Sequence, residues 1–298
     1  MTVYERIPRH MDSGHRFDQT RRWAATLSLG FEARQEREQT VTRMTRIRHQ
    51  GPLRVQRPFY PEGKAGCCHV YLLHPPGGLV SGDSLGIDVS VGPGALSLVT
   101  TPAAAKLYKA DSNGVAWQQH TKLNVAEGGT LEYLPQETLA FNGSKGEQTT
   151  TIDLETGAKC IGWEVLALGR PVGNLPFVTG HLEQRFRLNM NGKPLWLERQ
   201  ILDPLHARFQ GKWGQGGATV QATLWVVGLE DEAAAIEQIR EQLPASNRWA
   251  VTRRRGVVLL RYLGNERNEA WSVCQQAWVL LRPLLTGCSA VVPRIWLT

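Results

Sequence analysis

The sequence predicts a mainly β protein with two α-helices in the C-terminal part of the chain. Short runs of alternating or β-branched residues recur from about 23 to 228, and glycine-rich turns separate them. Beyond 228 the apolar spacing changes to that of helices. Many short strands with frequent turns fit a sandwich, a barrel or a β-solenoid, but no fixed period supports regular repeats.

Each expected strand is bounded by residues that favour turns. Clear strand patterns cover 85–91, 95–101, 115–125, 182–190 and 218–227. The turn signals are Gly92-Pro93-Gly94, Gly128-Gly129, Asn142-Gly143, Thr156-Gly157 and Asn191-Gly192. Because Asn191-Gly192 lies between two strand patterns, it predicts a two-residue hairpin.

Two segments have helical spacing. The first, 229–243, has acidic residues in its first turn and Pro244 after its end. The second, about 266–285, contains Pro283, which should kink or fray its last turn, and Gly287 can provide a left-handed cap. The predicted buried faces are Leu229, Ala233, Ile236, Ile239 and Leu243 in the first helix, and Ala270, Val273, Ala277, Trp278, Leu281 and Leu284 in the second.

The length permits one large domain or two smaller ones. Because the first helix begins close to where the strand region ends, a single domain over 21–298 is the simpler interpretation, preceded by a mobile extension over 1–20. No apolar run is long enough to span a bilayer, and the N-terminus lacks the apolar segment of a signal peptide. Five cysteines without framework spacing predict reduced thiols in the cytoplasm.

Positive charge is concentrated at the N-terminus. The first sixty residues contain twelve arginines and six acidic residues, whereas the rest of the chain is nearly balanced. Such a segment could dock on an acidic partner, but a solvated surface is the simpler interpretation. Because no nucleic-acid motif accompanies the charge, we expect no nucleic-acid partner.

The glycine-rich segment 77–83 superficially imitates a phosphate-binding loop. A true P-loop continues with lysine and a helix, whereas Asp83 stands at that position here and a strand pattern follows. Asp83 would repel phosphates. Nucleotide-binding and hydrolase motifs are otherwise missing from the sequence, so no catalytic residues are predicted.

Possible metal ligands lie just upstream of this segment. Cys67, Cys68 and His69 could supply ligands to zinc or nickel, with His74 a few residues further on. Core packing is the favoured interpretation of the two cysteines. A loosely binding path of carboxylates, imidazoles and waters remains open, because such a path has no compact signature.

Three carboxylates lie in apolar surroundings. Asp83 ends the glycine-rich segment, Glu164 lies within CIGWEVLALG, and Glu198 lies within PLWLERQILD. Burial of a charged group is costly unless it is paired or coordinates a metal. An outward-facing position is the favoured alternative for Glu198 and an equal alternative for Glu164.

At these residues the sequence resembles the urease accessory protein family UreD, also called UreH. The matching motifs are GPLRVQRPFYPE (51–62), CHVYLLHPPGGLVSGD (68–83), GALSLVTTPAAAKLYK (94–109), LEYLPQETLAFNGS (131–144) and GWEVLALGRP (162–171). The resemblance runs from about Trp23 to the C-terminus. Ser81-Gly82-Asp83 departs slightly from the Gly-Gly-Asp that is commoner in the family.

The resemblance implies a maturation factor and not an enzyme. Proteins similar to this one assemble with UreF and the GTPase UreG, bind apo-urease and help deliver nickel to its active site. The implied fold is a β-rich, helical or solenoid-like arrangement of strands with two helices, containing a water-filled tunnel for nickel. The polar residues that could line it are His74, Asp83, Glu164 and Glu198; the match is least distinctive at Glu198. Nickel would bind transiently, and no tightly bound cofactor is expected.

Two other functions stay open. The chain could be a purely structural adaptor that clamps UreF and urease while nickel never enters it. It could also be an enzyme that binds an acidic substrate, in which case Arg54, Arg57 and His74 should converge on one pocket.

Overall fold

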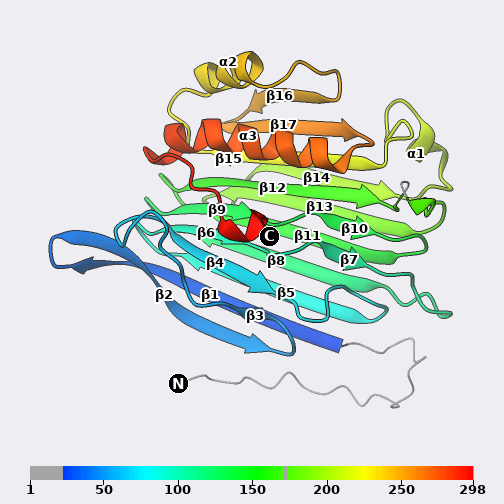
Figure 1. Cartoon of the computed structure of the whole chain (residues 1–298), viewed down its shortest axis with the longest axis horizontal. Helices are drawn as coiled ribbons and strands as arrows, with labels where there is room; N and C mark the ends of the chain where they lie inside the picture. Colours follow the sequence, from blue (N-terminus) through cyan, green and yellow to red (C-terminus); the bar gives the residue numbers. More distant parts are fainter. Residues whose placement is uncertain (1–22, 171–172, 298) are drawn as a thin grey trace.

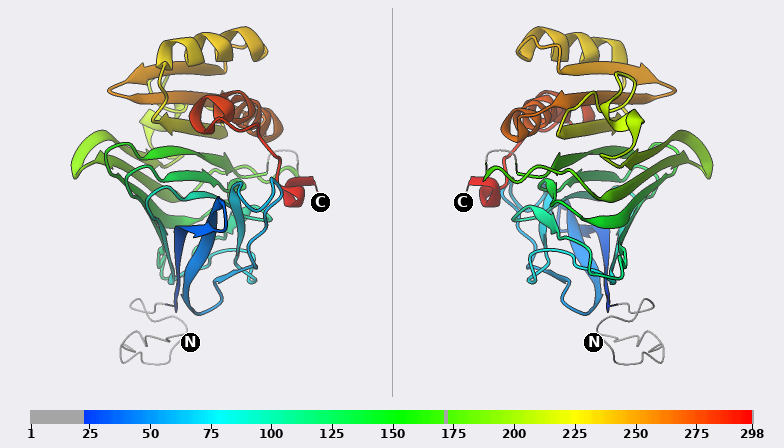
Figure 2. Two further views of the ribbon diagram at one scale, coloured as in Figure 1. Left: turned by 90° about the vertical axis from the view of Figure 1, so that its left-hand side faces the viewer. Right: turned by 90° about the vertical axis from the view of Figure 1, so that its right-hand side faces the viewer.

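The computed structural model describes residues 23–170 and 173–297. The extension expected over 1–20 lies outside the described residues. Two large sheets dominate the structure, and Figure 2 shows them as facing layers with the β1–β2 hairpin at one end and β16 and α2 at the other. The mainly β prediction is confirmed.

The first sheet has seven strands. Their order is β14 (Lys193–Leu202), β13 (His181–Met190), β11 (Lys145–Leu154), β8 (Trp117–Val125), β5 (Asp83–Val91), β1 (Trp23–Glu36) and β2 (Gln39–Gln50). The second sheet has ten. Its main order is β16 (Trp249–Arg254), β17 (Val257–Gly264), β15 (Val220–Val227), β12 (Lys159–Leu168), β9 (Thr130–Leu134), β6 (Leu96–Thr100), β4 (Cys68–Leu73) and β3 (Arg54–Val55), with β10 (Thr138–Ala140) against β12 and β7 (Ala105–Leu107) against β10.

From β4 to β13 the chain alternates between the sheets. β4, β6, β9 and β12 enter the second sheet, β5, β8, β11 and β13 enter the first, and neighbours within each series are parallel. Each turn of the chain therefore adds one strand to each layer around a shared core (Figure 1). This winding is the part of the fold closest to the solenoid-like arrangement that the resemblance implied.

Short glycine turns close these coils at one end. Gly94, Gly128 and Gly157 all have positive φ. An ideal Cβ on Gly128 would lie 3.8 Å from the backbone nitrogen of Gly94, and one on Gly157 would lie 3.9 Å from the backbone nitrogen of Gly128. Glycine adopts this left-handed backbone with the least strain, and without side chains the turns can stack closely. Their unequal spacing in the sequence explains why no fixed period is visible.

The Asn191-Gly192 hairpin is confirmed. Both residues have positive φ, and Met190 pairs with Lys193 where β13 meets β14 in antiparallel register. Such a pair of φ values is characteristic of a type I′ turn, which matches the twist of the flanking strands.

Three α-helices are present among the described residues: α1 (Ala207–Gln210), α2 (Glu232–Gln242) and α3 (Arg267–Thr286). The two long ones were predicted, and the short α1 was missed. Gly287 has a φ of 75° and caps α3 as expected, and the helix continues through Pro283 to Thr286. Two face assignments were wrong: Ala233 and Leu284 are exposed, whereas Ala235 and Leu285 are buried.

Two apolar cores hold the layers together. One fills the space between the sheets, and the other lies between the second sheet and helices α2 and α3. Figure 1 shows α3 lying over β15 and β17, with its axis roughly along the strands. Alternate residues of β12 and β15 face each core, which is the period of two that the sequence displayed.

Candidate functional site

A cavity lies between the sheets at the end where the long loops gather. It is lined by residues that follow β4, β6 and β9, and by side chains at the start of first-sheet strands. We call it the inner cavity; its volume is about 130 Å³, and its polar lining includes His74, Gln119, Gln148, Glu164 and Gln184. Arg54 and Arg57 are not among its lining residues, so the pocket expected for an acidic substrate is not formed.

His74 follows β4 at the rim of the inner cavity. Its Nε2 atom is buried and has no hydrogen-bond partner among the described residues. Burial lowers the pKa of His74, because an imidazolium would lose its hydration there. A neutral imidazole with an unused ring nitrogen is the form that binds a transition metal.

Glu164 lies within β12 and points from the second sheet toward the first. The hydroxyl of Thr150 on β11 donates a hydrogen bond to its carboxylate. Protein encloses this carboxylate, but part of its surface borders the cavity. Burial raises the pKa of Glu164 to about 7; Thr150 opposes the rise and the charge of Glu198 adds to it. Glu164 can therefore exchange a proton for a cation near neutral pH.

Glu198 on β14 also faces the space between the sheets, so the outward-facing alternative was wrong. Its Oε1 accepts hydrogen bonds from Arg261 at 3.1 Å and Gln200 at 2.6 Å, and its side chain is 18% exposed. Glu164 and Glu198 line a second space, the middle cavity, of about 30 Å³. The structure thus brings these two predicted residues together.

Asp83 occupies a different position. It begins β5 and is buried, and its Oδ2 accepts a hydrogen bond of 2.8 Å from the backbone N–H of Val80. This bond closes the turn around Gly82, whose φ is 81°. Asp83 does not line the inner or the middle cavity. Asp83 is followed by a strand and not by a helix, which agrees with the conclusion from the sequence that this segment is not a phosphate-binding loop.

The structure also contains a row of glutamines that sequence reasoning missed. Gln119, Gln148, Gln184 and Gln200 stand opposite one another on β8, β11, β13 and β14. Gln184 lines both the inner and the middle cavity. Their signal was a polar residue at an inward-facing position of each strand, but register between distant segments is not visible in one sequence.

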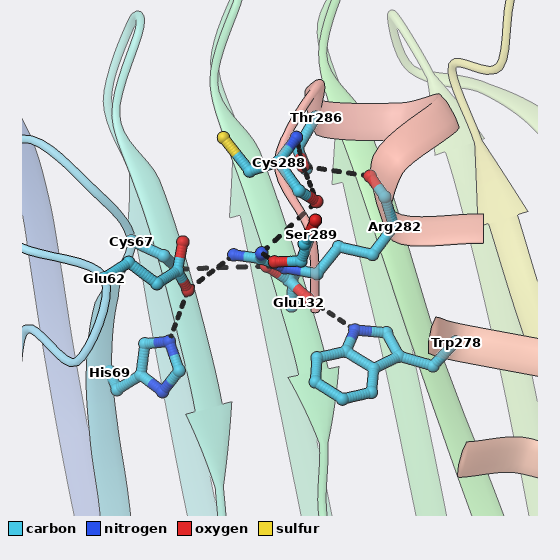
Figure 3. A network of polar contacts seen from close by, with 9 residues as sticks. All are labelled: Glu62, Cys67, His69, Glu132, Trp278, Arg282, Thr286, Cys288 and Ser289. Carbon is cyan, nitrogen blue, oxygen red and sulfur yellow. Dashed lines mark hydrogen bonds and ion pairs between the residues drawn. The ribbon is translucent and has the colours of Figure 1, made fainter. Parts of the chain in front are cut away.

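A buried network of charges lies on the other face of the second sheet, beneath α3 (Figure 3). The Nε of Arg282 is 2.9 Å from Glu132, its Nη2 is 2.7 Å from Glu62, and it also donates to the carbonyl of Ser289. Trp278 donates to Glu132 at 2.6 Å. Two carboxylates outweigh the effect of burial and raise the pKa of Arg282. The network fixes α3 and the segment after it to the sheet.

Cys67 and His69 belong to this network. Their ligand atoms and that of Glu62 lie within 4.8 Å of one another, which is close enough for one metal ion. However, Glu62 Oε1 already accepts from both His69 Nε2 and Arg282, so a guanidinium supplies the positive charge. Burial raises the pKa of Cys67 well above its ordinary value, which keeps the thiol protonated. Core packing explains these residues better than metal binding.

Comparison with known proteins decides the family. The model of the family described as UreD urease accessory protein matches residues 24–297. The chain is 72% identical to the urease accessory protein UreD of Marinobacter nauticus over the full length of both chains. It is 64% identical to UreD 1 of Psychrobacter cryohalolentis, again over both full lengths, and 66% identical to UreD of Pseudoalteromonas translucida over 96% of this chain and 95% of that protein.

The chain belongs to the UreD family of urease accessory proteins. The predicted family is confirmed, and with it the assignment to urease maturation and not to an enzyme class. In the part of the chain that the structure describes, no helix is long and apolar enough to cross a membrane. The cavities between the sheets are thus features of a UreD protein.

Proposed function

We propose that this chain is a nickel-delivery scaffold. It bridges apo-urease to the accessory proteins UreF and UreG and helps pass nickel to the urease active site along a polar path between its sheets. Nickel is the cargo of this path and not a resident cofactor. Membership of the UreD family supports the role in urease maturation, and the cavities support the path.

The observation that carries the proposal is a series of three adjoining cavities. The inner and middle cavities share Glu164 and Gln184. The middle cavity shares Gln200, Gln221 and Thr223 with an outer cavity of about 370 Å³, which lies beside Arg261 and Trp213. Polar side chains are therefore present at each junction.

The donor groups suit a cation that must be released again. Imidazole nitrogen and carboxylate oxygen bind Ni²⁺ with intermediate affinity, whereas a site of several thiolates would hold it tightly. In this proposal His74, Glu164 and Glu198 contact nickel in turn. Asp83, which the resemblance included among the residues that could line the path, borders neither the inner nor the middle cavity, and its role in this proposal is to hold the loop that follows His74 in its turn.

The proposal assigns GTP hydrolysis to UreG, because the glycine-rich segment of this chain lacks the lysine and the helix of a nucleotide site. It places the chain in the cytoplasm, which is consistent with five free cysteines. It involves neither nucleic acid nor a membrane.

Urease activation by the purified complex tests the proposal. Glu164→Ala and Asp83→Ala should slow nickel-dependent activation while the variant chain still co-purifies with urease and UreF. Glu38→Ala, an exposed carboxylate in the β1–β2 turn, is the matched control and should activate at the wild-type rate. If Glu164→Ala also activates at that rate, its carboxylate does not carry the metal; a wild-type rate for Asp83→Ala would show that the turn which Asp83 closes is not required.

The alternative function is a structural adaptor that clamps UreF and urease without conducting metal. Two exposed apolar side chains in the segment between β14 and β15 favour a docking role: Trp213, which lines the outer cavity and is 91% exposed, and Leu205, which is 78% exposed. Thr223→Phe, which fills the junction of the middle and outer cavities, separates the two functions. A conducting scaffold loses activation with its complex intact, whereas an adaptor keeps both.

A further inference from the structure

A bridge of amides crosses the space between the sheets at the middle cavity. Gln221 on β15 of the second sheet donates through Nε2 to Gln184 Oε1 at 2.6 Å and to Gln200 Oε1 at 2.7 Å. Both acceptors belong to the first sheet, on neighbouring strands β13 and β14. One side chain therefore ties two strands of the opposite layer together.

The hydrogen bonds extend beyond the bridge in both directions. Gln184 donates to Gln148 at 3.1 Å, and Gln200 donates to Glu198 at 2.6 Å. Glu198 is in turn held by Arg261. An ionised carboxylate only accepts hydrogen bonds, so Glu198 fixes the NH₂ group of Gln200 toward itself and the carbonyl oxygen toward Gln221. The orientation of the amides thus follows from one charge.

The bridge occupies the narrowest part of the series of cavities. The middle cavity, at about 30 Å³, holds one or two water molecules, which is too little for a divalent cation with its hydration shell. The inner cavity on one side and the outer cavity on the other are several times larger. A cation travelling between them must therefore displace Gln184, Gln200 or Gln221.

We propose that Gln184, Gln221 and Gln200 form a closed gate on the metal path, which a cation at Glu198 opens. The inference rests on the proposed path for nickel. Arg261, which lines the outer cavity, already pairs with Glu198 while the Gln200 NH₂ group faces the carboxylate, so the trigger is a divalent cation that enters from the outer cavity and displaces the guanidinium. Bound to Glu198 without its full hydration shell, such a cation repels the NH₂ group of Gln200 and attracts its carbonyl oxygen as a ligand, so rotation of the terminal amide becomes favourable. Gln221 then faces an NH₂ group and loses one of its two acceptors. Opening requires side-chain rotation only, and neutral amides present no charge that would trap the ion.

Two substitutions of Gln221 distinguish an open gate from a blocked one. Gln221→Leu keeps the bulk and removes the hydrogen bonds, so it should lower the rate of urease activation at least about tenfold, equivalent to about 1.4 kcal/mol in the barrier. Gln221→Ala removes the bulk and should activate at or above the wild-type rate. Gln118→Leu is the matched control, because Gln118 lies on β8 beside the row but lines none of the three cavities. If Gln221→Leu does not fold, Gln200→Leu blocks the bridge from the first sheet.

A second measurement does not depend on urease. Titration of the Glu164 carboxyl by NMR in the isolated chain reports whether water enters from the outer cavity. Gln221→Ala should lower the Glu164 pKa by at least about one unit, because hydration favours the carboxylate. Gln118→Leu should leave that pKa within a few tenths of the wild-type value.

Each outcome bears on one proposal. If Glu164→Ala abolishes activation but Gln221→Leu does not reduce it, the gate is wrong while the nickel path stands. If a folded Gln221→Ala chain activates tenfold more slowly than the wild type, the amide is required for passage and does not obstruct it, which also refutes the gate. If Glu164→Ala activates normally, the proposed nickel path is wrong. Independently, an unchanged Glu164 pKa in Gln221→Ala would show that the amide bridge does not keep water of the outer cavity from Glu164.

Discussion

Replacement of Glu164 by glutamine should stabilise the protein, and only at neutral and alkaline pH. Burial raises the pKa of this carboxyl from 4.5 to about 7, so the folded state binds its proton more tightly than the unfolded state does. Below about pH 4.5 the carboxyl is protonated in both states, and its ionisation does not change the free energy of unfolding. Between about pH 4.5 and pH 7 ionisation lowers the free energy of unfolding progressively, and above about pH 7 the whole loss is present. At 1.36 kcal/mol per pKa unit, the full cost is about 3 kcal/mol.

Glutamine keeps the acceptor for the Thr150 hydroxyl and removes the charge. Urea unfolding at pH 5 and pH 8 measures the effect: Glu164→Gln should be more stable than the wild type by about 3 kcal/mol at pH 8 and by no more than about 1 kcal/mol at pH 5. Glu38→Gln, in an exposed turn, should show no such difference. A stability gain of the same size at both pH values would refute the reasoning, because it could not come from ionisation.

Three further substitutions test the packing around the site by urea unfolding. Arg282→Met should cost about 3–5 kcal/mol because it leaves Glu132 charged and buried, and the double variant with Glu132→Gln should recover part of that loss; no recovery would mean that Arg282 acts through packing alone. Gly162→Ala should cost about 1–3 kcal/mol, since an ideal Cβ would lie 2.5 Å from the Trp225 ring, and a neutral result would show that the ring can move. Asn191→Ala should cost about 1 kcal/mol because alanine tolerates positive φ less well, and equal stability would argue against strain in this turn.

The local elements could be predicted from the sequence because their signals are local. Alternation marked the strands, glycine and asparagine marked the turns, and helical spacing marked α2 and α3. The winding could not be predicted, because it depends on pairing between coils of unequal length. Stacked glycines such as Gly94 and Gly128 look like ordinary turns in the sequence.

The candidate site was predicted in part. Glu164 and Glu198 stood out because a carboxylate among apolar residues is costly to bury, and the structure brings them to one cavity. The glutamines were missed because what brings them together is the register between distant strands, which one sequence does not reveal. Glu132 and Arg282 were missed as a pair because they are 150 positions apart in the sequence, although each alone interrupts an apolar stretch.

The pairing of Glu132 with Arg282 sets an order of events during synthesis. β9, which carries Glu132, emerges from the ribosome long before α3, which carries Arg282. The coils around β9 must therefore pack while the Glu132 carboxylate still lacks its guanidinium partner. A chain that stops after β17 would keep that charge and expose the apolar face that α3 covers. Vectorial folding of this protein therefore ends with its last long helix, and truncated chains should accumulate as aggregates.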